Sequence, residues 1–220
     1  MTSTSSSRNA SYRPDIESST CAPVPAATPI ELERRGIRAS GFELNPDYVA
    51  LAKARAEAAG VAPQIVVGDV RSAEFGSGFD AAILMWQSFG YFSDDENGAL
   101  LRRIRNALKP GARFVLEVLN RDFLLRHFEA RAKHIVDGIE VVEERTFDML
   151  TSRMSSVIKR KEKAAVVTRQ TDWRLYSLHE LDTLGKAAGL FLLAAYGGLD
   201  RKPADLETRL MRLVYARSEP

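Results

Sequence analysis

One carboxylate, that of Glu43, stands at the end of an apolar segment and is followed at once by the signals of a helix start. Residues 37–44 (IRASGFEL) predict a strand, and Asn45 with Pro46 predicts the N-cap and first position of a helix. Because open α/β sheets bind ligands beyond the carboxyl ends of their strands, a carboxylate there can accept hydrogen bonds from the vicinal hydroxyls of a ribose. A sheet that binds no nucleotide could also carry a glutamate at that position, so Glu43 alone leaves both interpretations open.

Strand-like and helix-like segments alternate from residue 29 to residue 119, which predicts a parallel sheet with right-handed crossovers. The expected elements are a helix at 29–35, strands at 37–44, 64–67, 79–85 and 113–119, and helices at 46–59 and 93–108. The buried stripe of the 46–59 helix is predicted to contain Tyr48, Leu51, Ala52, Ala56 and Ala59.

The pattern changes to period-two segments at about 133–174, which predicts an antiparallel β insert. A capping box at 177–180 then predicts a helix, and two apolar runs at 190–196 and 210–216 predict a final antiparallel pair. We therefore expect an α/β fold with a mixed sheet, made of one domain at 28–220 after an irregular segment at 1–27.

Composition narrows the possible partners. The chain has 220 residues and a formal charge of +2, which argues against nucleic acid or an anionic membrane as the main partner.

Cys21 is the single cysteine, so no internal disulfide can form. No run reaches the roughly 18 apolar residues of a membrane span. We expect a cytoplasmic protein. His127, His134 and His179 do not cluster in sequence, so no metal site is expected.

Four features then occur in order along the chain: Glu43, Asp69, Asp80 and the segment 108–111 (LKPG). Together they resemble the class I S-adenosylmethionine-dependent methyltransferases over about residues 30–217. The segment 87–91 (QSFGY) is most similar to small-molecule members of that family. The resemblance implies a Rossmann-like fold, S-adenosylmethionine as cofactor and a small-molecule methyl acceptor.

The resemblance also implies site residues. The cofactor contacts would be Glu43, Leu44, Asp69, Val70, Met85 and Gln87, and the acceptor contacts Tyr91, Asn120 and Arg121. Within the first set, Glu43 would accept from the ribose hydroxyls and Asp69 from the adenine amino group. Asp69 could instead be a simple turn residue after Gly68, and no catalytic base is identified.

The chain departs from this family where a first strand and a glycine-rich loop are expected. No glycine occurs from Met1 to Arg35, and Pro23 and Pro25 occupy the place of the loop. Proline fixes φ and has no N–H, whereas the loop uses free backbone groups and positive φ. We therefore expect a sheet that lacks its usual first strand and a cofactor affinity that is weak or absent.

Three explanations stay open for this departure: a truncated or frame-shifted chain, a degenerate member without catalysis, and a member that completes its site with a partner. The function predicted is methyl transfer to an amine or hydroxyl of a small molecule, impaired by the missing loop. A non-catalytic binding or scaffold protein of the same shape is the main alternative. A nicotinamide-dinucleotide dehydrogenase is weaker, because the chain contains no Gly-x-Gly-x-x-Gly motif. The sequence leaves a homo-oligomer open.

Overall fold

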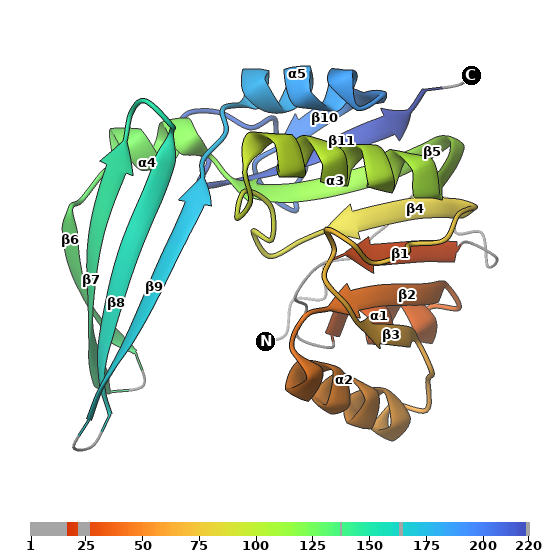
Figure 1. Cartoon of the computed structure of the whole chain (residues 1–220), viewed down its shortest axis with the longest axis horizontal. Helices are drawn as coiled ribbons and strands as arrows, with labels where there is room; N and C mark the ends of the chain where they lie inside the picture. The colour runs from red at the N-terminus through yellow and green to blue at the C-terminus, as the bar shows by residue number, and fades with distance from the viewer. Residues whose placement is uncertain (1–16, 22–26, 137, 163–164, 219–220) are drawn as a thin grey trace.

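A computed structural model of the chain describes residues 17–21, 27–136, 138–162 and 165–218 (Figure 1). The described residues form two sheets and five helices. In chain order the elements are β1 (Glu17–Cys21), α1 (Ala27–Arg34), β2 (Arg38–Glu43), α2 (Pro46–Ala58), β3 (Gln64–Val67), β4 (Phe79–Leu84), α3 (Asp94–Ala107), β5 (Leu108–Leu119), α4 (Arg121–Arg126), β6 (Arg131–Val136), β7 (Ile139–Asp148), β8 (Arg153–Glu162), β9 (Ala165–Arg174), α5 (Leu178–Ala187), β10 (Leu190–Tyr196) and β11 (Leu210–Arg217).

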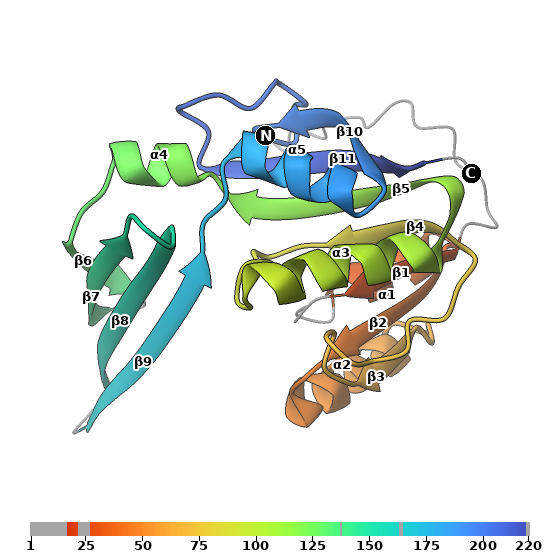
Figure 2. The ribbon, with the colours of Figure 1, turned by 45° about the horizontal axis from the view of Figure 1, so that its top comes forward.

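The main sheet is mixed, as predicted. Its strand order is β10-β11-β5-β4-β1-β2-β3, in which β1 to β5 pair in parallel and β10 and β11 are antiparallel. The order reverses between β1 and β4, so ligands are expected beyond the carboxyl ends of these two strands. Their arrowheads point toward the inserted sheet (Figure 1). Helices α3 and α5 lie in front of the main sheet in Figure 2, and α1 and α2 lie behind it.

The prediction that the main sheet lacks its first strand is wrong. Strand β1 occupies the central position, where Ser19 pairs with Ser40 of β2 on one side and with Ala82 of β4 on the other. The polar sequence ESSTC concealed this strand, because ladder hydrogen bonds use only backbone groups and β2 and β4 both offer free edges to it. Residues 17–21 of the segment that was predicted to be irregular are therefore a strand of the domain, and residues 1–16 and 22–26 lie outside the described residues.

The antiparallel insert is confirmed. Its four strands follow one another in the order β6-β7-β8-β9, from Arg131 to Arg174. The chain enters the insert after α4 and leaves it just before α5, so the insert stands beside the main sheet at the end to which β1 and β4 point (Figure 1).

The two predicted capping boxes are present at the starts of α3 and α5. The predicted stripe of α2 is partly wrong. Val49 is buried with Ala52 and Ala56, whereas Tyr48 and Leu51 are exposed. Apolar residues at both 48 and 49 allow two stripes one position apart, and the sequence did not show which of them faces the sheet.

Candidate active site

A cavity of about 370 Å³ opens where the predicted site residues converge. Three parts of the main sheet contribute its walls: the residues after β2, the residues after β3, and the end of β4 with its following loop. The residues that line it are Phe42, Glu43, Leu44, Asn45, Gly68, Asp69, Val70, Arg71, Leu84, Ser88, Tyr91 and Phe92. The polar groups on these walls are few and the apolar ones many, which is typical of a small-molecule site.

Glu43 is the buried carboxylate of this cavity, with only 6% of its surface exposed. Its Oε1 accepts a hydrogen bond from the backbone N–H of Asn45 at 2.8 Å, which fixes the side chain at the strand end. Its Oε2 is buried and accepts no hydrogen bond from any described residue. A buried carboxylate oxygen without a donor is costly, so this atom is ready to accept from a ligand hydroxyl.

Asp69 lines the same cavity but is already paired. Arg71 donates to both of its carboxylate oxygens, from Nε at 3.1 and 3.0 Å and from Nη2 at 2.7 Å. The hydrogen bond from Arg71 lowers the pKa of Asp69 below its ordinary value. Arg71 also pairs with Glu96 at 3.3 Å and lies over the ring of Phe92. Sequence reasoning missed Arg71. A signal was available, because Arg71 lies two residues after Asp69 and its backbone N–H donates to the Asp69 side chain, which is the spacing of an Asx turn.

The end of β4 has an unusual backbone. Trp86 and Gln87 adopt left-handed conformations, with φ of 61° and 57°. Both carry side chains, so the turn is strained. The N–H of Trp86 donates to Glu117 at 3.3 Å, and Glu117 is held by Arg212 at 2.8 Å. A glutamate in the otherwise apolar run of β5 was a signal for this contact that sequence reasoning did not use.

The structure brings together only part of the predicted set. Glu43, Leu44, Asp69, Val70 and Tyr91 line the cavity, whereas Met85, Gln87, Asn120 and Arg121 do not. Asn120 caps α4 and donates to the backbone oxygens of residues 205 and 208, both at 2.9 Å. Arg121 pairs with Glu180 at 2.8 Å. These two acceptor contacts stay predictions, with side chains that already have structural partners.

Metal sites and membrane-spanning helices are both absent from the described residues. No group of three or more His, Cys, Asp or Glu residues in that part of the chain is arranged to hold a metal ion. No helix in the same residues is long and apolar enough to cross a membrane.

Comparison with known proteins gives the family. Residues 25–111 match the model of a methyltransferase domain. Among solved structures, an S-adenosylmethionine-dependent methyltransferase from Clostridium acetobutylicum is similar, with a TM-score of 0.82 and 14% identity over 93% of this chain and 85% of that one. A methyltransferase from Streptomyces caelestis has a TM-score of 0.82 and 19% identity, over 92% of this chain and 89% of that one. Residues 25–111 therefore carry a methyltransferase domain, and the fold of the chain is that of S-adenosylmethionine-dependent methyltransferases. No curated protein matches it in sequence.

A third similar structure was solved with S-adenosylmethionine bound. It is an amino pentose methyltransferase from Micromonospora echinaspora, with a TM-score of 0.69 and 22% identity over 94% of this chain and 85% of that one. The family and its cofactor, S-adenosylmethionine, were thus predicted correctly, and the likeness of fold extends through the insert to the last strands.

The residues of this methyltransferase fit the adenosine part of the cofactor. Oε2 of Glu43, which has no partner among the described residues, suits a sugar hydroxyl. The side chains of Leu44, Val70 and Phe92 offer an apolar surface to a flat base. The segment that would replace the glycine-rich loop, with Pro23 and Pro25, lies outside the described residues.

Proposed function

We propose that this methyltransferase moves a methyl group to an amine or a hydroxyl of a small molecule. The observation that carries the proposal is the buried carboxylate of Glu43, a residue that lines a cavity beyond the carboxyl ends of parallel strands and whose Oε2 has no donor among the described residues. S-adenosylmethionine, when bound, supplies a methyl group on a positively charged sulfur that is already activated for transfer. The work left to the chain is mostly positioning.

Each proposed contact uses a group that the fold already holds in place. Glu43 would accept a hydrogen bond from a ribose hydroxyl while its other oxygen stays on Asn45. Asp69 keeps acceptor capacity beyond its bonds to Arg71, because a carboxylate has about four lone-pair sites, and would accept from the adenine amino group. Met85 and Gln87 are proposed to face the methionine part of the cofactor.

The nature of the acceptor is supported by similar structures. One is described as an amino pentose methyltransferase and another, from Streptoalloteichus, as a sugar N-methyltransferase with a TM-score of 0.68. An uncharged amine needs no general base before it attacks, whereas a hydroxyl does. The two carboxylates that line the cavity, Glu43 and Asp69, are both proposed as cofactor contacts, which leaves neither of them as a base for a hydroxyl. Tyr91, exposed on the cavity wall, is the proposed acceptor contact nearest to the cofactor residues.

The affinity for the cofactor is proposed to be low. Pro23 and Pro25 stand where related proteins present backbone N–H groups, and a proline offers none. Losing two or three contacts of about 1 kcal/mol each weakens binding by roughly one to three orders of magnitude. A non-catalytic protein of the same shape is the alternative, and it differs in predicting no binding at any accessible concentration.

Calorimetric titration tests the proposal. The full chain is titrated with S-adenosylmethionine, and Glu43→Ala serves as the matched variant, with NAD as the control ligand. We expect weak binding to the native chain, loss of that binding in Glu43→Ala, and none to NAD. A further variant that keeps β1 and replaces residues 22–26 with a glycine-rich loop should bind more tightly. Absence of binding in every variant would support the non-catalytic alternative.

A further inference from the structure

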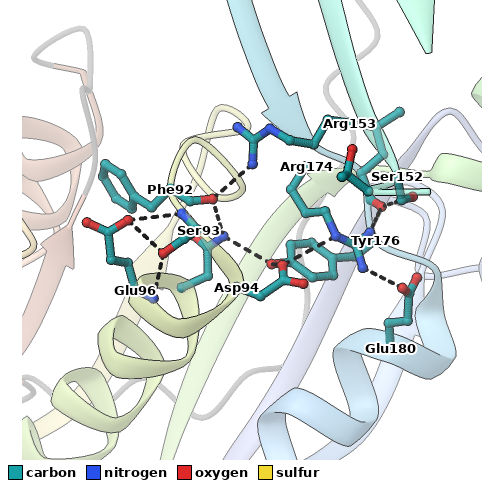
Figure 3. A network of polar contacts seen from close by, with 12 residues as sticks. Phe92, Ser93, Asp94, Glu96, Ser152, Arg153, Arg174, Tyr176 and Glu180 are labelled. Atoms are coloured by element: carbon teal, nitrogen blue, oxygen red, sulfur yellow. Dashed lines mark hydrogen bonds and ion pairs between the residues drawn. The ribbon is translucent and has the colours of Figure 1, made fainter. Parts of the chain in front are cut away.

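The inserted sheet holds one wall of the cavity. The carbonyl of Gly90, in the loop between β4 and α3, accepts a hydrogen bond from the backbone N–H of Arg174 at 2.7 Å. Two residues later, the carbonyl of Phe92 accepts from Nη1 of Arg153 at 3.2 Å (Figure 3). Arg153 and Arg174 are partners across the ladder of β8 and β9. Tyr91 and Phe92 line the cavity, so the insert holds this wall in place from two adjacent strands.

The contact at Gly90 tolerates no side chain. Gly90 has a φ of 101°, which favours glycine, and a Cβ there would collide with the carbonyl oxygen of Arg174. The loop and the end of β9 are therefore in backbone-to-backbone contact, and a shift of one is transmitted to the other.

The side chain of Arg174 holds the end of β9 in place, in addition to the backbone contact with Gly90. Only 11% of it is exposed, and it bridges the first turns of two helices, with Asp94 of α3 at 3.3 Å and Glu180 of α5 at 2.6 Å. Its guanidinium lies over the ring of Tyr176, 4.3 Å from the centroid, and the hydroxyl of Tyr176 donates to Asp94 at 2.6 Å (Figure 3). A buried guanidinium with this many partners has one well-defined position.

We infer that Arg174 is a positioning residue through which the inserted sheet sets the affinity of the cavity for its cofactor. Arg174 does not line the cavity. Its backbone N–H contacts Gly90, which adjoins Tyr91, and its side chain, paired with α3 and α5, holds that backbone in place. The inference rests on the proposed function, because it assumes that the cavity holds S-adenosylmethionine. Any acceptor that moves the insert must then change cofactor affinity, and by linkage the cofactor changes acceptor affinity by the same factor.

Two measurements on the full chain test this inference. The variants are Arg174→Met, which removes the charge, and Arg174→Lys, which keeps the charge but not the fork of donors. Lys186→Met is the control for charge, because Lys186 forms an exposed pair with Asp182. Leu190→Ala is the control for stability, because Leu190 is fully buried in the core.

The first measurement is hydrogen exchange of residues 88–92 without ligand, and the second is calorimetric titration with S-adenosylhomocysteine. We expect Arg174→Met to speed exchange in that loop and to weaken binding by roughly tenfold or more, since small displacements at a site have effects of this size. Arg174→Lys should give an exchange rate and an affinity between those of Arg174→Met and the native chain. The two control variants should leave both the exchange rate and the affinity unchanged.

Two outcomes would count against different claims. If Arg174→Met and Leu190→Ala gave the same loop exchange and the same affinity, Arg174 would be one more stabilising residue and the inference would be wrong. If the native chain bound no S-adenosylhomocysteine, the proposed function would fail instead, while exchange in the ligand-free chain would still decide whether Arg174 holds the wall.

Discussion

The two halves of the main sheet are packed very differently. Strands β4, β5, β10 and β11, with α3 and α5, enclose a cluster of 18 buried apolar residues, whereas α1, α2, β2 and β3 enclose a cluster of 5 among the described residues. The half with the smaller cluster carries Glu43 and Asp69. The difference indicates a division of tasks, in which one half supplies most of the stability and the other carries the carboxylates that line the cavity.

Removing packing from the larger cluster should have the greatest effect. Phe114 is fully buried in β5 and stacks on Tyr215 at a centroid distance of 5.9 Å. We expect Phe114→Ala to lower the free energy of unfolding by about 3–5 kcal/mol, the usual cost of such a cavity, as measured by urea denaturation. A loss below about 1 kcal/mol would contradict the view that this half stabilises the fold.

A change at Glu43 should weaken cofactor binding without lowering the stability of the fold, in contrast to the change at Phe114. Glu43→Gln keeps the shape of the side chain but replaces a buried carboxylate oxygen, Oε2, that has no donor among the described residues. We expect cofactor binding to weaken by about 1–3 kcal/mol while the ligand-free chain unfolds at the same or a higher urea concentration. Calorimetry and denaturation of the same samples measure both. A clear loss of stability in the free chain would show that Glu43 is a structural residue.

Shortening one side chain in the smaller cluster tests whether that cluster contributes less to the free energy of unfolding than the larger one. Ile65 lies in β3 and is buried against α2. Ile65→Val should lower the free energy of unfolding by about 0.5–1.5 kcal/mol, and Leu116→Val in β5 serves as the matched control in the larger cluster. The comparison would be weakened if Ile65→Val proved the more damaging of the two in the same denaturation assay.

The last expected effect concerns the stability of the fold in acid. Burial alone would raise the pKa of Glu180, but Arg174 and the cap at Ser177 outweigh it and lower that pKa from 4.5 to about 2. A lowered pKa in the folded state means that the ionised carboxylate stabilises the fold above pH 4.5, and that this contribution is lost as the pH falls toward 2. Glu180→Gln should therefore be less stable than the native chain at pH 7, with a difference that shrinks below pH 4.5 in urea titrations. A difference independent of pH would contradict this.

Most of the fold could be predicted because local patterns and tertiary packing agree. The capping boxes at Ser93 and Ser177 place α3 and α5, and the change from helical to alternating periodicity marks the insert. Strand β1 escaped prediction because its place is decided by the free edges of β2, the next strand along the chain, and of β4, two strands further on, and not by its own polar residues.

The site was predictable only in part, for a similar reason. Glu43 and Asp69 follow strands that can be recognised singly, and the rule that parallel strands end at one edge brings them together. Arg174 and Glu117 act through contacts with Gly90 and Trp86, and no short-range pattern links residues so far apart in the chain. Asn120 shows the reverse error, because the correct edge of the sheet does not tell whether a side chain is already engaged by the fold.

The turn at Trp86 and Gln87 has a consequence for anyone who redesigns this protein. Asn-Gly would adopt the same two left-handed conformations with little penalty, whereas the residues present each cost of order 1–3 kcal/mol. A search for thermostable variants should therefore converge on this dipeptide. The same change would remove the indole of Trp86, which is 53% exposed beside the central strands. Selection for heat resistance alone would therefore alter the surface of the sheet's ligand-facing edge.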